Sequence, residues 1–394
     1  MVDLIDLVAT FATFYGIYAI LAISLNLEYG YAGQPNFGQV LFYGIGAFVA
    51  AIAAANLLPL FARLPIGNIC NVHTSFPVRL AIGSNDPGIA IPVWIIGLVF
   101  AMIAGGILGL FLSYPAIRVK EEWYLSMILL VAAEAFVTIF QNTPQLACGI
   151  FGLDGIQNPF YWVSNTYSNS SFASTELGFD LPGIIYASII MAFAGICYLV
   201  AQKLANSPYG RLLKSVRDDK VAAESLGKDV AKVRRQIMII GSIMAGLAGG
   251  LYVFYIGVAV TDDYVPAVTF TIWVMMILGG YANNKGVLAG AAALTLLQRG
   301  SVEVSLILQA SFPGFSSNVL IYLEYVAEAV ILILLLMYRP KGLIPETRIE
   351  TKAYQLFDFR KRDTPDPSSK QETTDVSDSK GKSASSNIDE NVAR

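Results

Sequence analysis

Residues 236–260 read QIMIIGSIMAGLAGGLYVFYIGVAV, an uninterrupted stretch of 25 residues without a charged side chain. The hydrocarbon core of a bilayer is about 30 Å thick, and a helix needs about 20 apolar residues to cross it. This stretch therefore predicts a transmembrane helix. The whole chain agrees, because 55% of its 394 residues are hydrophobic and 14% are charged, with a mean hydropathy of +0.58. Such a composition excludes an ordinary soluble globular protein.

Further apolar runs of similar length occur along the chain. They lie near residues 7–27, 40–62, 89–117, 123–142, 182–202 and 318–338. Two shorter runs, 265–282 and 286–298, are expected to cross the membrane as a tight pair. The first run follows no basic segment of the kind that opens a signal peptide, so we expect it to remain as a helix. The sequence predicts an all-α, polytopic membrane protein with about 8–10 transmembrane helices.

Glycine pairs at four-residue spacing occur inside several of these runs. Examples are Gly105 with Gly109, Gly246 with Gly250, and Gly286 with Gly290. Small residues at this spacing let two helices approach closely. We interpret these pairs as packing signals, since they are frequent in membrane helices of every class.

The basic residues are distributed unevenly among the loops. None of the 26 lysines and arginines falls inside an apolar run. If successive spans alternate in direction, all lysines and arginines except Arg63, Arg79 and Arg299 lie on the same side of the membrane as residues 203–235. Cytoplasmic loops carry the excess of basic residues, so this side, with the C-terminus, is predicted to be cytoplasmic.

Residues 203–235 form a polar insertion between two apolar runs. Asp218 or Asp219 can cap a short helix that contains Ala222 and Ala223, and Gly227 can end it in the left-handed conformation. A helix of two turns is too short to be stable alone, so we expect it to pack against something. A solvated loop at an anionic lipid surface is the alternative, but the Ala-Ala-x-x-x-Gly spacing favours a docking surface.

Residues 26–39, NLEYGYAGQPNFGQ, interrupt the first two apolar runs and predict a broken helix near 28–39. Non-helical backbone at membrane depth is tolerated where protein or a water-filled cavity satisfies it, and such breaks often line a substrate path. A half-helix that begins near Asn36 could hold a carboxylate with its free N–H groups. An ordinary cytoplasmic loop is the alternative. The candidates for a substrate path in this segment are Asn26, Gly30, Gly33, Gln34, Asn36 and Gly38.

Three glutamates lie within predicted spans. Glu134 lies deep in the run 123–142, where a central carboxylate costs about 2.5–3.5 kcal/mol to insert, and it is a further candidate for the path. Glu324 and Glu328 are four residues apart and share one helical face. These two are expected to be structural glutamates, protonated or reaching toward the membrane surface.

The cysteines do not suggest a metal site, because the three are far apart and the chain has one histidine. Cys70 and Cys148 fall in predicted outside loops, where they could form a disulfide or remain two free thiols. From Asp363 onward the chain is rich in Ser, Thr, Asp and Lys and is expected to be disordered. We therefore divide the chain into a membrane domain, 1–345, and a tail, 346–394.

Several motifs together resemble the permease subunits of branched-chain amino acid importers of the ABC class. The coupling motif of that family is similar to Ala222-Ala223-x-x-x-Gly227, preceded by Ser207-Pro208-Tyr209-Gly210-Arg211. Residues 25–34 and 339–343 also agree with the family and in the right order. The chain departs from it at Val221, where glutamate is customary, and at residues 36–39, where the family has Ser-x-Gly-His.

This resemblance implies a plasma-membrane permease domain, 1–345, that carries a cytoplasmic coupling insertion, 203–235, followed by a cytoplasmic tail. It implies a second homologous permease, two cytoplasmic ABC ATPases and an extracytoplasmic binding protein as partners. The chain would not be an enzyme and would bind no cofactor, because ATP and Mg²⁺ would be used by the ATPase chains. The residues implied in ATPase coupling are Arg211, Arg217, Asp218, Ala222, Ala223, Glu224 and Gly227.

The favoured substrate is a branched-chain or other hydrophobic amino acid. Related permeases make urea or another small polar solute the alternative, and sugars or nucleosides are more remote. A rival of another class is a secondary transporter or channel, in which the intramembrane glutamates would carry protons or ions. That class often shows inverted repeats between its halves, and none is visible in this sequence.

Overall fold

The computed structural model describes residues 4–64, 68–71, 73–118, 122–164, 180–311 and parts of 326–346. These residues belong to one compact unit, Met1–Glu346. The predicted disorder of the tail, Glu324, Glu328 and most of the span predicted at 318–338 lie outside the described residues.

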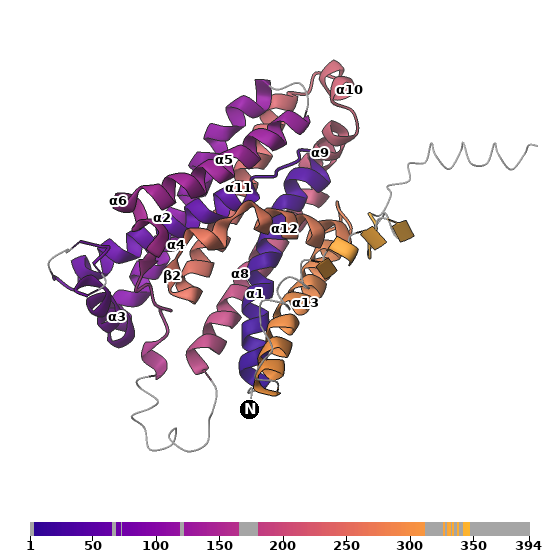
Figure 1. The fold of residues 1–394 in the computed structure, drawn as a ribbon. Coiled ribbons are helices and arrows are strands. Elements are labelled where there is room, and N and C mark those ends of the chain that lie inside the picture. Colours follow the sequence, from indigo (N-terminus) through magenta and orange to yellow (C-terminus); the bar gives the residue numbers. More distant parts are fainter. Residues whose placement is uncertain are drawn as a thin grey trace, which may run out of the picture. The chain divides into compact units, whose positions relative to one another are not determined.

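The described part of the chain is helical almost throughout (Figure 1). The long helices are α1 (Leu4–Leu25), α2 (Gln39–Phe61), α4 (Pro87–Arg118), α5 (Glu122–Asn142), α8 (Leu181–Asn206), α11 (Val230–Ile256) and α13 (Asn284–Ser311). The shorter helices are α3 (Ser75–Asn85), α6 (Pro144–Ala147), α9 (Pro208–Asp218), α10 (Lys220–Ser225) and α12 (Pro266–Gly279). A π-helix (Asn26–Tyr31) extends α1, and two 3-10 turns lie at Gly149–Phe151 and Thr261–Tyr264.

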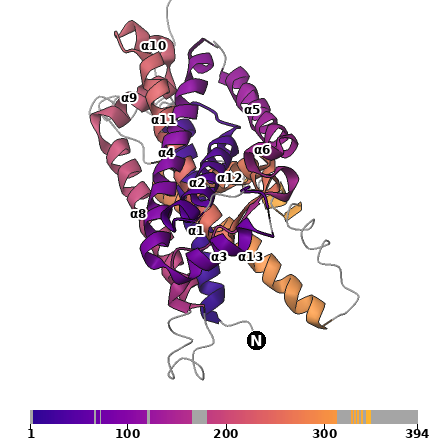
Figure 2. The ribbon, with the colours of Figure 1, turned by 90° about the vertical axis from the view of Figure 1, so that its left-hand side faces the viewer.

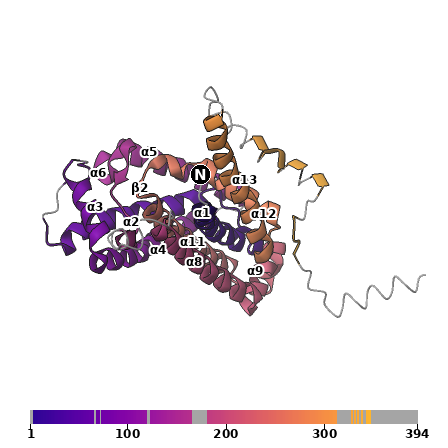
Figure 3. The ribbon, with the colours of Figure 1, turned by 90° about the horizontal axis from the view of Figure 1, so that it is seen from below.

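Among the described residues, six helices are long and apolar enough to cross a membrane: Ile5–Tyr31, Gln39–Phe61, Pro87–Pro115, Trp123–Asn142, Leu181–Asn206 and Val230–Ile256. They correspond to six of the predicted spans and confirm an all-α membrane protein. The two runs of the predicted tight pair form α12 and α13, which pack against each other (Figures 1 and 3). That this pair crosses the membrane stays a prediction. Its second member is longer than the run 286–298, because helix α13 continues through polar residues to Ser311.

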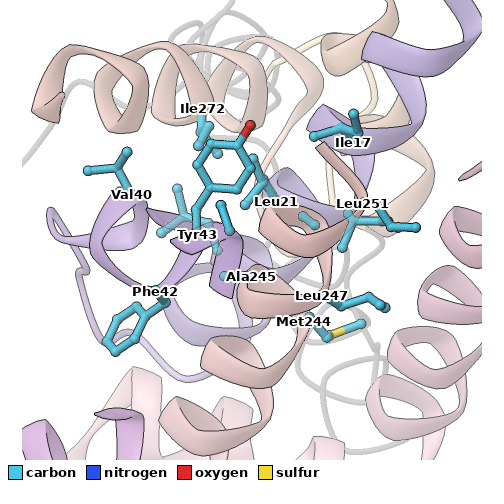
Figure 4. Close-up of a cluster of buried hydrophobic side chains, with 14 of the residues drawn as sticks. Ile17, Leu21, Val40, Phe42, Tyr43, Met244, Ala245, Leu247, Leu251 and Ile272 are labelled. Carbon is cyan, nitrogen blue, oxygen red and sulfur yellow. The ribbon is translucent and has the colours of Figure 1, made fainter. Parts of the chain in front are cut away.

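Helix α11 is the centre of the packing, with α2 and α4 against it. A Cβ atom built on Gly46 would meet the backbone of Gly246, and one built on Gly105 would meet the backbone of Ser242. The glycine pairs that contain Gly105 and Gly246 are thus confirmed as packing positions. Figure 4 shows the apolar cluster in which Leu21 and Tyr43 lie beside the side chains of α11.

The loops at the α3 end of the molecule are tied together by several bonds. Strands β1 (Leu153–Asp154) and β2 (Val258–Ala259) pair antiparallel. The buried guanidinium of Arg79 donates to the carbonyl oxygens of Ile69 and Asp154, at 2.9 and 2.6 Å. Cys70 and Cys148 form a disulfide, which is the first of the two alternatives for these cysteines. Helices α9 and α10 lie at the opposite end (Figures 1 and 2).

Candidate functional site

The helix break lies where the sequence predicts it, between α1 and α2. The π-helix Asn26–Tyr31 is followed by non-helical backbone, and α2 begins at Gln39 rather than near Asn36. Gly33 adopts a φ of +68°, a value that favours glycine. The amide N–H of Gly33 donates to Tyr29 O at 2.9 Å, so the break has a defined local structure.

Polar side chains gather behind this break in a cluster that we call the polar junction: Ser24, Glu28, Asn36 and Gln39. Each of these residues is at most 1% exposed. Nδ2 of Asn36 donates to Glu28 Oε2 at 2.7 Å and to Gln39 Oε1 at 2.9 Å. Nε2 of Gln39 donates to Ser24 Oγ at 2.7 Å, and Ser24 Oγ donates to the carbonyl oxygen of Gly241 at 2.8 Å. The polar junction therefore fastens the break to α11.

Two other helices bind the same segment. The indole Nε1 of Trp273 in α12 donates to Asn36 O at 3.0 Å, and Thr269 Oγ1 in α12 accepts from Val40 N at 3.0 Å. The hydroxyl of Ser126 in α5 donates to Pro35 O at 3.1 Å. The break is thus hydrogen-bonded to α5, α11 and α12, so its movement would change contacts with all three helices.

Asn26 connects the break to the turn between α12 and α13. Its Oδ1 accepts from Ala282 N at 2.8 Å, and its Nδ2 donates to Asn284 Oδ1 at 2.9 Å. A Cβ on Gly30 would overlap Asn26 Oδ1 and lie 2.7 Å from Ala282 N. Only glycine at position 30 leaves room for this contact.

The candidates for a substrate path are only partly brought together. Asn26, Gln34 and Asn36 are at most 1% exposed, so they pack inside the protein instead of lining an open channel. Gly30 and Gly38 are also buried, whereas Gly33 is half-buried. The side chain of Glu134 is exposed on α5 and takes no part in the polar junction.

Glu28 is the residue that sequence reasoning missed. Its carboxylate is fully buried, and Oε1 has no hydrogen-bond partner among the described residues. A Cβ on Gly241 would overlap that oxygen, so α11 lies directly against it. The sequence did contain a signal for Glu28 as a site residue, since it is an acidic residue between the first two apolar runs and near the amide side chains of Asn26 and Gln34.

The polar insertion folds as two capped helices. Ser207 Oγ accepts from Gly210 N at 3.3 Å at the start of α9, and Asp219 Oδ1 accepts from Ala222 N at 3.0 Å at the start of α10. Gly227 follows α10 with a φ of +75°. The expected short helix, its aspartate cap and its left-handed glycine are therefore confirmed, with Asp219 as the cap.

The exposed face of α10 differs from the expected one. Ala223 is 3% exposed and packs inward, whereas the resemblance places it among the residues of ATPase coupling. Ala222, Glu224 and Gly227 are exposed, as is Arg211 on α9. Val221 and Leu226 expose 73% and 79% of their surface. These two apolar side chains form what we call the docking surface.

Arg217 also differs from its expected position, because it is turned into the protein. Its Nη1 donates to Gly30 O at 2.7 Å and lies 3.1 Å from Glu346 Oε2, and its Nε donates to Asp218 Oδ1 at 3.1 Å. Burial lowers the pKa of this guanidinium, but the carboxylates of Glu346 and Asp218 outweigh it, and the pKa lies above its ordinary value. Lys214 Nζ adds a second ion pair to Glu346, at 2.7 Å.

These features define a class: an all-α, multi-pass membrane protein with a broken helix between its first two spans and a capped polar insertion at one end. Residues 7–338 match the family model of the permease component of branched-chain amino acid transport systems. The chain belongs to this family. It is a transport permease subunit and not an enzyme.

Two relatives illustrate the similarity. The chain is 31% identical over 337 residues to the probable branched-chain amino acid transport permease protein LivM of Methanocaldococcus jannaschii, covering 84% of this chain and 91% of that protein. It is 24% identical over 342 residues to the high-affinity LivM permease protein of Escherichia coli, covering 84% and 68%.

A third relative carries another substrate in its name. The guanosine ABC transporter permease protein NupQ of Bacillus subtilis is 26% identical over 240 residues, which cover 61% of this chain and 72% of that protein. No solved structure matches the chain.

Proposed function

We propose that this chain is the membrane permease of an ATP-driven importer of branched-chain or other hydrophobic amino acids. An extracytoplasmic binding protein delivers the substrate, a second homologous permease completes the pathway, and two separate ATPase chains bind and hydrolyse ATP with Mg²⁺. The end with α9 and α10 faces the cytoplasm, as does the C-terminal tail that follows the membrane domain. The family and the substrates in the relatives' names support this proposal.

The observation that carries the proposal is the docking surface. Helix α10 is held by a cap and by the buried Ala223, yet it presents Val221 and Leu226 outward at the basic end of the protein. Burying a valine or leucine side chain fully is worth about 1.5–3 kcal/mol. If a groove on an ATPase subunit covered both side chains, their burial would contribute several kcal/mol of binding free energy without any change in the shape of α10.

The proposed substrate path runs through the helix break. Asn26, Gly30, Gly33, Gln34, Asn36 and Gly38 would border it when the break opens. All of them except the half-buried Gly33 are buried in the structure, so the proposal requires the break to move before they can contact a substrate. For Glu134, which lies on the exposed face of α5, the proposal requires that face to border the path.

Co-purification of the tagged full-length chain from its native membrane tests the docking surface. We expect two ABC ATPases and a second permease to accompany the wild type, and the Val221→Asp/Leu226→Asp variant to lose the ATPases. Phe151→Asp is the matched control, because Phe151 is 79% exposed at the other end of the protein. Equal ATPase recovery with all three chains would refute the proposal for α10.

Uptake by proteoliposomes of the purified complex tests the substrate. We expect ATP-dependent accumulation of labelled leucine, isoleucine or valine in the presence of the binding protein. Urea and guanosine are the competing solutes. ATP-dependent uptake of one of them alone would refute the proposed substrate class but would still support an ATP-driven importer. Uptake driven by a proton gradient without ATP would identify a secondary transporter instead.

A further inference from the structure

The docking insertion touches the helix break directly, through residues far apart in the sequence. Arg217 in α9 donates to the carbonyl oxygen of Gly30 in the π-helix, at 2.7 Å. A Cβ built on Gly33 would lie 2.9 Å from Arg217 Cγ and 3.3 Å from Arg217 Cβ. The end of α9 therefore contacts the break directly at this point.

A segment near the C-terminal end of the membrane domain holds Arg217 in place. Glu346 accepts from Arg217 Nη1 at 3.1 Å and pairs with Lys214 Nζ at 2.7 Å. Just before it, Leu343 N donates to Leu278 O at 2.9 Å, so this segment is also fixed to the end of α12.

Together, these contacts form a closed ring of four segments, one of which is α9. The turn after α12 binds Asn26 of the π-helix, as described above, and Asn283 in that turn donates from Nδ2 to Pro345 O at 3.2 Å. From α9 the ring passes to the break, to the α12–α13 turn, to residues 342–346 and back to α9. The break and α9 are therefore joined both directly and through residues 342–346.

We propose that Arg217 is a positioning residue that makes α9 and the helix break move as one unit, so that displacement of the docking surface is transmitted directly to the break. This inference rests on the proposed function. It predicts that loss of the arginine separates ATP hydrolysis from transport without preventing assembly. Arg217 would then act inside the permease and not at the ATPase interface.

The first test compares Arg217→Met with Lys203→Met, an exposed control at the end of α8. In proteoliposomes of the full complex, ATP hydrolysis and uptake of labelled leucine are measured together. We expect Arg217→Met to keep its ATPases and its hydrolysis, while leucine taken up per ATP falls about tenfold, as loss of a hydrogen bond from a charged donor allows. Unchanged uptake per ATP would overturn the inference.

The second test replaces the arginine contact by a covalent one. The distance between the Cβ positions of residues 33 and 217 is close to the roughly 3.5–4.5 Å of disulfides. In a Cys197→Ala background, the Gly33→Cys/Arg217→Cys variant is compared with Arg217→Cys alone and with Gly33→Cys alone, which controls for a side chain at the positive φ of residue 33. We expect the oxidised pair to regain uptake per ATP and to lose it on reduction, whereas the single variant stays impaired. Wild type treated with the same reductant controls for the Cys70–Cys148 bond.

Two outcomes of the second test would count against the inference. One is a folded double variant whose thiols do not cross-link, because the two elements would then not be held together. The other is a cross-linked variant that remains uncoupled. Thiol labelling measures the cross-link independently of transport. If the wild type takes up no leucine, the proposed function is contradicted, but labelling still tests whether residues 33 and 217 are in contact.

Discussion

Replacing Gly249 by alanine is expected to destabilise the centre of the protein. Gly249 lies in α11 where this helix crosses α2, and an added Cβ would overlap Tyr43 O and lie 2.8 Å from Ala47 N. Both neighbours are backbone atoms, so no side-chain rotation can relieve the contact and the helices must separate. Overpacking of this kind costs about 1–3 kcal/mol.

The matched control is Gly195→Ala in α8. A Cβ at this position meets no heavy atom within 4 Å. The chemical change is the same in both variants, and the gain in helix propensity is up to about 1 kcal/mol. Any difference between the two variants therefore reports the packing of α11 on α2.

The assay is the fraction of detergent-purified protein that stays monodisperse on size exclusion after heating. The temperature at which half of the protein is lost should be several degrees lower for Gly249→Ala than for the wild type. For Gly195→Ala it should be equal to the wild-type temperature or slightly higher. Equal midpoints for the two variants would refute the close approach of α11 and α2 at this position.

Three further predictions concern other regions. Asn36→Leu should lower stability by about 1–3 kcal/mol in thermal unfolding, because it leaves the buried Glu28 without its amide donor; the double variant with Glu28→Leu should recover, and a double variant as unstable as the single one would contradict this. In Cys70→Ser, Cys148 should react with maleimide without reductant, whereas reaction of Cys148 in the unreduced wild type would exclude the disulfide. Asp219→Ala should weaken α10 by about 1 kcal/mol, seen as faster amide hydrogen exchange, and unchanged exchange would show that the cap is dispensable.

Local properties of the sequence predicted much of this structure. The apolar runs became helices because a helix satisfies its backbone hydrogen bonds within one segment, which a membrane requires. The ends of α10 could be predicted for a similar reason, since Asp219 and Gly227 act on backbone groups only a few residues away. Family membership also followed from local motifs.

Two acidic residues show what such reasoning did not reach. Both Glu28 and Glu134 stand in or next to apolar runs, but the sequence analysis singled out Glu134 alone, because it lies deep in its run. The structure buries Glu28 against Asn36 and α11 and leaves Glu134 on an exposed face. Which face of a helix is covered depends on its neighbours, and a single sequence does not specify them.

The sequence alone thus determined the membrane class, most of the spans, the position of the break and the capped insertion, because each depends on residues within a few turns of one another. Only the tertiary structure decided that Arg217 turns inward to Gly30, 187 residues away, and that Ala223 is buried while Val221 and Leu226 remain exposed. These outcomes depend on which distant segments the packing of the helices brings together.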